Sequence, residues 1–351
     1  MTALALPNSS PITTRSGHVL PSRVFSAPMA GYTDPPYREL MKEFRIPVLF
    51  TEMIDSHALV HRNDKTSKML GRRDQQLFTQ IAAGTAVLAD GALSVLLEED
   101  IRGINLNMGC PAKKVVSCGG GSNLLRHPTI IRDICRNVRK RASHIPFSVK
   151  FRSGWDMTSL NFLEVGKIFE DEGVDFVILH ARTRTQAFSG RAHWNHIRML
   201  KDHLRIPVIG NGDVVSYETA KAMVDASGCD GIAIGRGVIG NPWLYLQAAA
   251  ALEGDAPLKE PSIDERFRII TRHYELILDY FGSRLSTHIF RKHLVGYLKG
   301  LPGQKLVKEE LFKDEALSLE RLKDVLGEYF LALKTGLSLP NVAPKDLAQT
   351  A

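Results

Sequence analysis

Short apolar runs recur along most of the chain, and segments with apolar residues at helical spacing follow many of them. A short apolar run between polar segments is typical of a buried strand, and helical spacing is typical of a helix packed on one side. The predicted strands are residues 24–27, 48–50, 77–81, 104–106, 147–149, 176–179, 208–209 and 232–234. The predicted helices are residues 37–44, 86–97, 129–142, 160–172 and 217–226, and a polar lead-in precedes them up to about Pro21.

The alternation of strand and helix predicts a parallel sheet with crossover helices. A (β/α)8 TIM barrel, which is an α/β fold, contains eight such units. We therefore predict this fold. A doubly wound open sheet is the alternative topology. No Gly-x-Gly-x-x-Gly segment opens the first helix, which counts against the dinucleotide-binding form of that sheet.

The end of the chain has a different pattern. Residues 253–261 are rich in Gly, Pro and charge, and strand signals stop beyond them. Ser262 and Glu265 have the spacing of a capping box, and helical periodicity follows over residues 267–281, 287–298 and 319–333. We therefore predict a barrel domain over residues 1–252 and a C-terminal helical domain of three or four helices over residues 262–338.

Polar side chains follow nearly every predicted barrel strand. Active sites of this fold lie at the C-terminal ends of the strands, so these residues are expected to meet at one face. They are Pro28, Met29, Glu52, Gln80, Asn107, Lys150, His180, Asn211 and Arg236.

Cys110 stands where a predicted strand ends. Pro111 restrains it to extended conformations, and Lys113, Lys114 and a triple glycine follow. This setting favours a reactive or acid–base thiol, and a thiol without a histidine base can donate its proton in a reduction. The alternative is an inert, buried cysteine.

Several cations also follow strands. Lys150 either lies on the barrel rim or faces an anionic or electron-rich ligand atom. His180, Arg182 and Arg184 fit a phosphate or nucleic-acid contact, or salt bridges to helix ends. Glycine-bearing turns follow the last two strands, where this fold commonly binds phosphate, and they favour a phosphate-bearing cofactor over ordinary tight turns.

Composition narrows the class of protein. Four cysteines without a CxxC pair fit a reduced cytoplasmic protein and predict neither a disulfide framework nor a metal site. No apolar run is long enough to span a bilayer, and the first ten residues do not resemble a signal peptide. The net charge of +7 is compatible with nucleic-acid binding. Basic residues of the tail, which include Arg284, Arg291, Lys292 and Lys299, form either an RNA contact or a solvated face.

Nine segments of the chain, taken together and in order, resemble the tRNA-dihydrouridine synthases, most of all their bacterial B-type branch. They are APMAGYTD (27–34), TEM (51–53), QIA (80–82), NLNMGCP (105–111), GGGSNLL (119–125), VKFRSGW (149–155), HARTR (180–184), IGNGD (209–213) and AIGRGVIGNPW (233–243). The resemblance implies an FMN-binding barrel with a tRNA-binding helical domain.

The resemblance also implies roles for single residues. Pro28 and Met29 would pack against the flavin ring, Gln80 and Lys150 would bond its polar edge, His180 would support it, and Asn211, Asp213, Gly235 and Arg236 would hold the ribityl chain and phosphate. Asn107 and Arg182 would contact the uracil or its flanking phosphate, and Arg291 and Lys292 would contact tRNA through the tail.

The implied reaction reduces the C5=C6 bond of specific D-loop uridines in tRNA. NADPH reduces the flavin, a flipped-out uridine receives hydride at C6, and Cys110 protonates C5 as general acid. No obligate protein partner is expected. Two other classes stay open: an FMN barrel acting on a small molecule, such as a dihydroorotate dehydrogenase, and a non-catalytic RNA-binding protein. The basic tail counts against the first, and Cys110 with the phosphate loops counts against the second.

Overall fold

The computed structural model describes residues 10–46, 48–70, 77–99 and 101–336. The chain divides into two compact units, one running to Val238 and including Trp243–Leu258, the other formed by Ile239–Pro242 and the residues from Lys259 onward. The start of the chain, where no signal peptide is expected, and residues 337–338 of the predicted helical domain lie outside the described residues.

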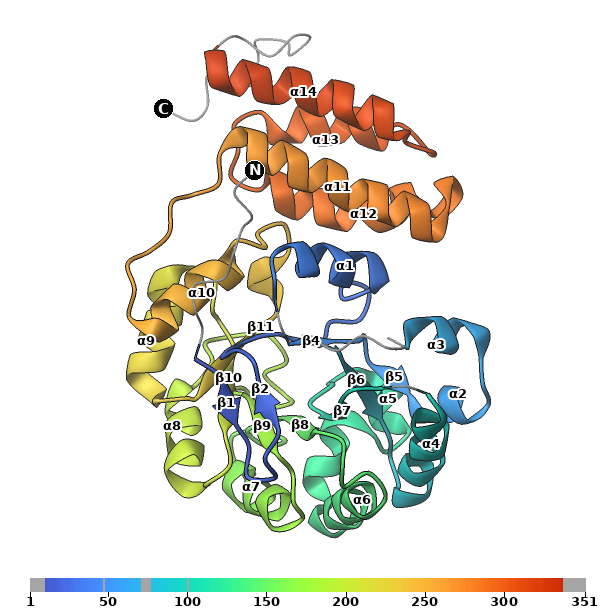
Figure 1. The fold of residues 1–351 in the computed structure, drawn as a ribbon, viewed down its shortest axis with the longest axis vertical. Helices are drawn as coiled ribbons and strands as arrows, with labels where there is room; N and C mark the ends of the chain where they lie inside the picture. Colours follow the sequence, from blue (N-terminus) through green and yellow to red (C-terminus); the bar gives the residue numbers. More distant parts are fainter. Residues whose placement is uncertain (1–9, 47, 71–76, 100, 337–351) are drawn as a thin grey trace. The chain divides into compact units, whose positions relative to one another are not determined.

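A ring of parallel strands forms the centre of the first unit (Figure 1). Its strands are β3 (Val24–Ser26), β4 (Leu49–Phe50), β6 (Leu77–Ala82), β7 (Ile104–Met108), β8 (Phe147–Arg152), β9 (Phe176–His180), β10 (Val208–Asn211) and β11 (Gly231–Ile234). All eight predicted strands are therefore present.

The order of these strands identifies the barrel. They run β3-β11-β10-β9-β8-β7-β6-β4, so each strand lies beside its neighbour in the chain. The Ser26 N–H donates to Val48 O at 3.0 Å, which joins β3 to the residue before β4 and closes the ring. A doubly wound sheet would reverse its strand order. The prediction of a (β/α)8 barrel is thus confirmed.

Two strand features of the first unit were not predicted. A hairpin of β1 (Ile12–Thr13) and β2 (Val19–Leu20) precedes the barrel, and β5 (Ile54–Asp55) pairs with β6. Ile12 and Leu20 are buried in one cluster with aromatic residues of the barrel interior. The sequence indicates only a polar lead-in here, because each strand of the hairpin has two residues and a single buried side chain.

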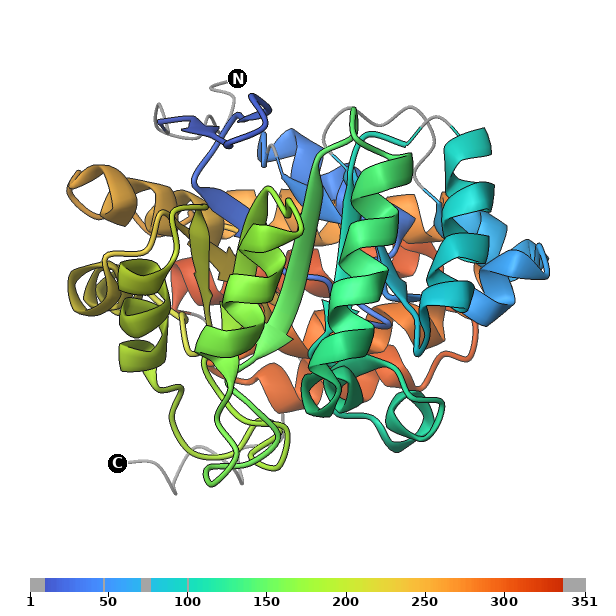
Figure 2. The same cartoon turned by 90° about the horizontal axis from the view of Figure 1, so that it is seen from below.

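Helices surround the strands, as Figure 2 shows from a second direction. They are α1 (Pro35–Glu43), α2 (Ser56–Val60), α3 (Asp64–Met69), α4 (Ala86–Glu98), α5 (Lys113–Ser117), η1 (Gly121–Arg126), α6 (Pro128–Arg141), α7 (Phe162–Asp171), α8 (Trp194–His203), α9 (Tyr217–Ser227), η2 (Arg236–Val238) and α10 (Leu244–Glu253). Local signals set several boundaries: Asp34 caps α1 by accepting from the Tyr37 N–H, and Ser216 and Thr219 form a capping box at α9.

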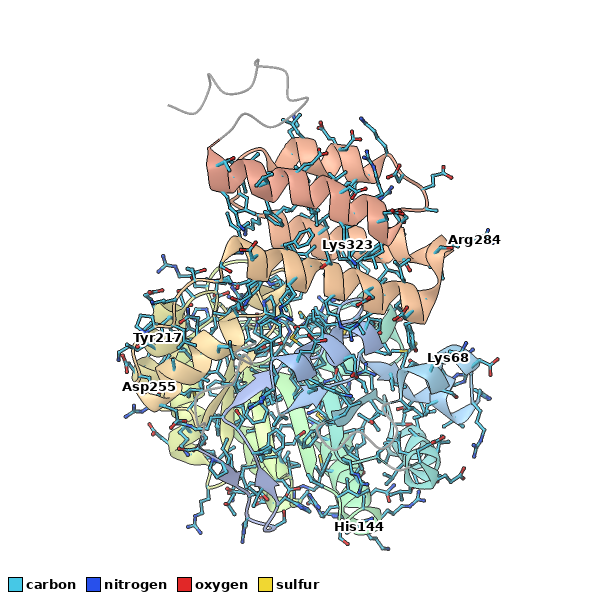
Figure 3. The ribbon with its side chains drawn as sticks, turned by 45° about the horizontal axis from the view of Figure 1, so that its top comes forward. Lys68, His144, Tyr217, Asp255, Arg284 and Lys323 are labelled. Atoms are coloured by element: carbon cyan, nitrogen blue, oxygen red, sulfur yellow. The ribbon has the colours of Figure 1, made fainter. Side chains whose placement is uncertain are left out.

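Four helices make up most of the described second unit. They are α11 (Ile263–Phe281), α12 (Ser283–Leu298), α13 (Gln304–Phe312) and α14 (Leu319–Thr335). The Ser262 hydroxyl accepts from the Glu265 N–H at 3.2 Å, as the capping signal predicts. Helix α11 packs against α12 and α14, and α13 packs against the same two helices. Arg284 and Lys323 are exposed on this unit (Figure 3). Within the described ranges, every helix is too short or too polar to cross a bilayer.

Candidate active site at the C-terminal ends of the barrel strands

A chain of hydrogen-bonded polar side chains crosses neighbouring strands of the barrel. Asn107 Nδ2 donates to Gln80 Oε1 at 2.9 Å, and Gln80 Nε2 donates to Asn105 Oδ1 at 2.6 Å. Asn105 Nδ2 donates to Ser148 Oγ at 2.8 Å, and Ser148 Oγ donates to Ile104 O at 3.3 Å. We call Asn107, Gln80, Asn105 and Ser148 the amide chain. The last three are fully buried, and satisfied buried polar groups of this kind fix one arrangement.

The amide chain holds the backbone of Cys110. Asn107 Oδ1 accepts from the Cys110 N–H at 2.9 Å, and Cys110 O accepts from Ser122 Oγ at 2.9 Å. A Cβ at Gly121 would lie 2.7 Å from Cys110 O, so a glycine is required for this close approach. Cys110 itself is partly exposed. The thiol therefore has a fixed backbone and access to a ligand.

Lys150 lies on the next strand, beside Asn107 in the register. Its Nζ donates to Asn211 Oδ1 at 3.0 Å, and Asn211 Nδ2 donates to Ala233 O at 2.7 Å. Desolvation of the ammonium, with the positive charge of Arg152 beside it, lowers the pKa of Lys150 to about 7. An anionic ligand beside Lys150 would therefore raise its pKa and favour the charged ammonium.

His180 is buried at the end of β9, beside Asn211 in the register. Burial is the main reason that the pKa of His180 falls well below its usual range, and the charges of Lys150 and nearby arginines add to it. The imidazole is therefore neutral at pH 7 and can donate or accept a hydrogen bond without adding charge.

Arg152 ties two loops of the site together. Its Nε donates to Gly109 O at 2.7 Å, and its Nη1 donates to Thr183 O at 2.9 Å and to Ala187 O at 2.8 Å. Burial lowers the pKa of Arg152 to about 10, which leaves the guanidinium charged at neutral pH. The cysteine loop and the loop after β9 are thereby joined through one side chain.

Arg182 is buried, with 2% of its surface exposed, and its donors are engaged inside the site. Its Nη2 donates to Asp213 Oδ1 at 2.7 Å and to Gly190 O at 2.6 Å. Burial opposes the charge of Asp213, but an N–H from Ala192 and the Arg182 guanidinium together hold the pKa of this carboxyl below its usual range. These contacts make Arg182 a support for the loops, and its predicted contact to uracil or phosphate stays a prediction.

The turns after β3 and β11 carry the other predicted ligand residues. Pro28 and Met29 are partly buried, and a Cβ at Gly235 would lie 3.7 Å from Met29 Sδ. Arg236 is exposed, and its guanidinium carbon lies 4.7 Å from the ring centroid of Phe188. Phe188, on the loop after β9, is 52% exposed. An exposed aromatic ring beside an arginine offers a stacking surface at this end of the barrel.

Sequence reasoning found most of this site and missed part of it. All predicted residues of the barrel lie within the last three residues of a strand or just beyond its C-terminal end. Asn105, Ser148 and Phe188 were not assigned a role. The alternation of Asn105 with Ile104 and Leu106 was the available signal for the amide chain, but the sequence does not show which strand lies opposite.

Arg291 and Lys292 belong to the second unit. Arg291 Nη2 donates to Phe312 O at 2.7 Å, and its guanidinium carbon lies 5.2 Å from the Phe312 ring centroid. Arg291 thus joins α12 to the end of α13, where carbonyl groups lack helical partners. Lys292 is partly exposed. Their predicted contact to tRNA stays a prediction.

The donor set of the site suits an anionic ligand. An ammonium, exposed and buried guanidinium groups and amides converge here, with Asp213 already paired to Arg182. Among the described residues, no group of three or more His, Cys, Asp and Glu side chains is placed to hold a metal ion. The arrangement therefore fits an electron-rich ring edge or a phosphate better than a cation.

Comparison with known proteins agrees with the motifs. The family model described as dihydrouridine synthase matches residues 25–330. The tRNA-dihydrouridine synthase B of Pasteurella multocida (strain Pm70) is 36% identical over 284 residues, which are 80% of this chain and 85% of that protein. A probable tRNA-dihydrouridine synthase of Rickettsia prowazekii (strain Madrid E) is 37% identical over 90% of this chain and 96% of that protein. The resemblance to the bacterial B-type branch is confirmed.

Solved structures share the fold at low sequence identity. Histamine dehydrogenase from Rhizobium sp. 4-9 is similar with a TM-score of 0.50 and 15% identity, over 77% of this chain and 51% of that one. A 2-naphthoyl-CoA reductase is similar with a TM-score of 0.51 and 11% identity, over 71% of this chain and 52% of that one. The match of the family model over most of its length and the identity to curated relatives show that this chain belongs to the dihydrouridine synthase family.

Proposed function

We propose that the protein is a flavin-dependent tRNA-dihydrouridine synthase that reduces the C5=C6 bond of uridines in the D loop of tRNA. The observation that carries the proposal is a partly exposed cysteine, fixed by the amide chain, at the end of a barrel whose sequence belongs to this family. Family membership also counts against the two alternative classes. tRNA and a nicotinamide reductant are available together in the cytoplasm, where we place the activity.

The residues of the barrel fit FMN. The ammonium of Lys150 and the amides of Asn211 and Gln80 supply donors for the electron-rich edge of an isoalloxazine ring. Gly235 leaves open space, because a Cβ there would meet only Met29 and Ala27 at ordinary contact distances. Arg236 is exposed and free to face a phosphate. Pro28, Met29, His180 and Asp213 complete the proposed FMN set.

Each group of the chain then has a chemical task. FMN held by these residues would supply the hydride for C6 of the uracil once NADPH had reduced it. Negative charge develops on the C5 side as C6 is reduced, and the thiol of Cys110 cancels it by giving its proton to C5. Asn107 orients that thiol through the Cys110 N–H. The positive cluster of Lys150 and Arg152 favours the charge that forms nearby.

The helical unit is proposed to bind tRNA. Arg284, Lys299 and Lys305 are exposed there, and basic residues of this kind neutralise phosphates of an RNA backbone. Arg291 and Lys292 belong to the same proposed face, with Arg291 also needed for the packing of α12 on α13.

The role of Cys110 is tested by Cys110→Ala. The variant should bind flavin and oxidise NADPH as the unchanged protein does, because the thiol is not needed for either step. It should reduce tRNA at least about 100-fold more slowly, the usual contribution of a positioned proton donor. Flavin absorbance, NADPH consumption and mass spectrometry of dihydrouridine measure the three quantities.

Cys118→Ala is the matched control, since Cys118 is an exposed cysteine just beyond α5. It should leave all three quantities unchanged. Full tRNA reduction by Cys110→Ala would exclude the general-acid role. A flavin-loaded protein that forms no dihydrouridine in any unmodified tRNA would exclude the proposed function.

A further inference from the structure

Two arginines lie over the ring of one tryptophan at the C-terminal end of the barrel. The guanidinium carbon of Arg184 is 4.6 Å from the ring centroid of Trp155, and that of Arg126 is 4.8 Å from it. Arg126 ends η1, Trp155 follows β8 and Arg184 follows β9. Three successive loops of the catalytic end therefore meet in this Arg126–Trp155–Arg184 cluster.

Backbone and side-chain hydrogen bonds fix the cluster. The Arg184 N–H donates to Gly154 O at 3.0 Å, and the Thr185 N–H donates to Trp155 O at 3.0 Å. Asn161 Nδ2 donates to Leu125 O at 2.6 Å, which ties the loop after β8 to the end of η1. Positions held by such bonds are preorganised, so a ligand does not have to order them.

The cluster holds two positive charges without a carboxylate. Among the described residues, neither Arg126 nor Arg184 forms an ion pair, and the Nε of Arg184 is buried without a hydrogen-bond partner. The nearby Asp156 carboxylate accepts from Thr158 Oγ1 at 2.7 Å and Ser159 Oγ at 2.8 Å instead. Two like charges held close together repel each other, and a bound anion removes that cost.

The geometry favours the phosphodiester backbone of RNA as that anion. A guanidinium stacked on an aromatic ring keeps its edge free for two parallel hydrogen bonds to phosphate oxygens. The segment η1 that ends at Arg126 also contains Ser122, whose hydroxyl bonds the carbonyl of Cys110. Arg126, one of the three cluster residues, is therefore on the same loop that carries the proposed proton donor.

We propose that the Arg126–Trp155–Arg184 cluster clamps a backbone phosphate of the substrate tRNA next to the reacting uridine. This rests on the proposed function, and it adds a contact on the barrel that is separate from the helical unit. The clamp would position the RNA strand at the active site, whereas the helical unit would supply most of the affinity for tRNA.

The test uses the full-length, flavin-loaded protein and an unmodified tRNA transcript. Arg126→Gln with Arg184→Gln should raise the Kd for tRNA about tenfold or more at moderate salt. The slope of log Kd against log salt should fall by about 0.7–0.9, which is the contribution of the one phosphate contact that is lost. Flavin content and NADPH oxidation without tRNA should stay unchanged.

The matched control removes the same charge elsewhere in the barrel unit. Lys140 and Arg205 are exposed, and Lys140→Gln with Arg205→Gln should change the Kd by no more than about twofold and leave the slope unchanged. An Arg126→Gln, Arg184→Gln protein that matches this control overturns the clamp. The proposed function fails separately, if the unchanged protein forms no dihydrouridine.

Two further variants keep the test informative if the first is poorly folded. Arg126→Lys with Arg184→Lys retains the charge but not the planar guanidinium with its paired N–H donors. The salt slope should therefore stay the same, and the Kd for tRNA should rise several-fold. Trp155→Leu retains both arginines but removes the ring on which they stack. It should also raise the Kd for tRNA, without changing the slope of log Kd against log salt. Wild-type affinity in both variants would contradict the clamp, because a phosphate clamp needs the paired N–H donors and the ring that supports them.

Discussion

Lys150 shows how one residue links the fold to ligand binding. A lysine at the end of a buried strand loses hydration, and Arg152 adds a like charge, so the pKa of Lys150 falls to about 7. An unfolded lysine keeps a pKa near 10.4, so between about pH 7 and 10.4 the unfolded chain binds a proton that the folded chain lacks. This group alone therefore makes the ligand-free protein more stable as pH rises through that range.

FMN affinity should have the opposite dependence on pH. If the charged form of Lys150 bonds the flavin, FMN affinity falls as pH rises above about 7, by up to about tenfold per pH unit until the pKa in the complex is reached. Titration of the flavin-free protein with FMN, followed by fluorescence quenching from pH 6 to 9, measures this. Lys150→Met should bind FMN weakly and without that dependence; a pH-independent affinity in the unchanged protein would contradict the assignment.

The sequence predicts which residues belong to the site more readily than which of their side chains contact one another. The chain shows that polar groups follow the strands, but strands of a parallel barrel are buried on both faces, so alternation does not tell which side chains meet. Asn105 reads as one polar residue in an apolar strand, and Ser148 as another. Only the register, which sets Asn105 beside Gln80 and Ser148, joins them.

At the scale of elements, the turns after β10 and β11 depend on close packing. A Cβ at Gly237 would lie 2.3 Å from Val214 O and 2.8 Å from Leu244 Cδ2. Gly212 has φ of 127°, and a Cβ there would lie 2.8 Å from Ala192 Cβ. The sequence indicated glycine-bearing turns for a phosphate, and the structure adds that these glycines also let two loops touch.

Gly237→Ala should therefore disturb both loops at once. Overpacking of this kind costs about 1–3 kcal/mol of the free energy of unfolding, and FMN affinity should fall because Arg236 moves with its turn. Chemical denaturation and FMN titration measure the two effects.

Gly327→Ala is the control for Gly237→Ala. Gly327 lies inside α14, where a Cβ would meet nothing within 4 Å. The same change should there stabilise the protein by about 0.5–1 kcal/mol, as alanine does in a helix. Equal effects at the two positions would contradict the packing argument.

The eight strands and several of the long helices were predictable, whereas α8, α10, α13 and the shortest elements were not. The eight strands and the helices α4, α6 and α9 follow from apolar spacing, capping residues and prolines. The hairpin β1–β2 and helix α5 are too short to carry a pattern of their own, and their packing against the barrel decides their conformation. The loop from Thr183 to Phe188 is set by carbonyl contacts to Arg152, which no local signal reveals.

At the scale of the whole molecule, we assign the reduction of uridine to one unit and most of the affinity for tRNA to the other. The barrel unit holds the cysteine and the proposed flavin residues, and the helical unit exposes Arg284, Lys299 and Lys305. Flavin reduction by NADPH should therefore be independent of the helical unit, whereas tRNA binding should depend on it.

Lys299→Glu with Lys305→Glu tests this division. The Kd for tRNA should rise about tenfold or more and its salt slope should fall by about 1.5 or more, because two phosphate contacts are lost and repulsion replaces them. The rate of flavin reduction should not change. Combined with the Arg126→Gln and Arg184→Gln changes, the effects on log Kd should add, since the two sets share no partner. Unchanged tRNA binding would show that this part of the helical unit is not the RNA face.

The amide chain also has a consequence for how this family varies. Its donors all run in one direction, from the Cys110 N–H through Asn107, Gln80 and Asn105 to Ser148 and a main-chain carbonyl. Exchanging a single member for an acid or an apolar residue would orphan the groups on either side of it. Amino-acid changes at these four positions should therefore occur in pairs. Each pair would restore the order of donors and acceptors, so that Cys110 keeps its position.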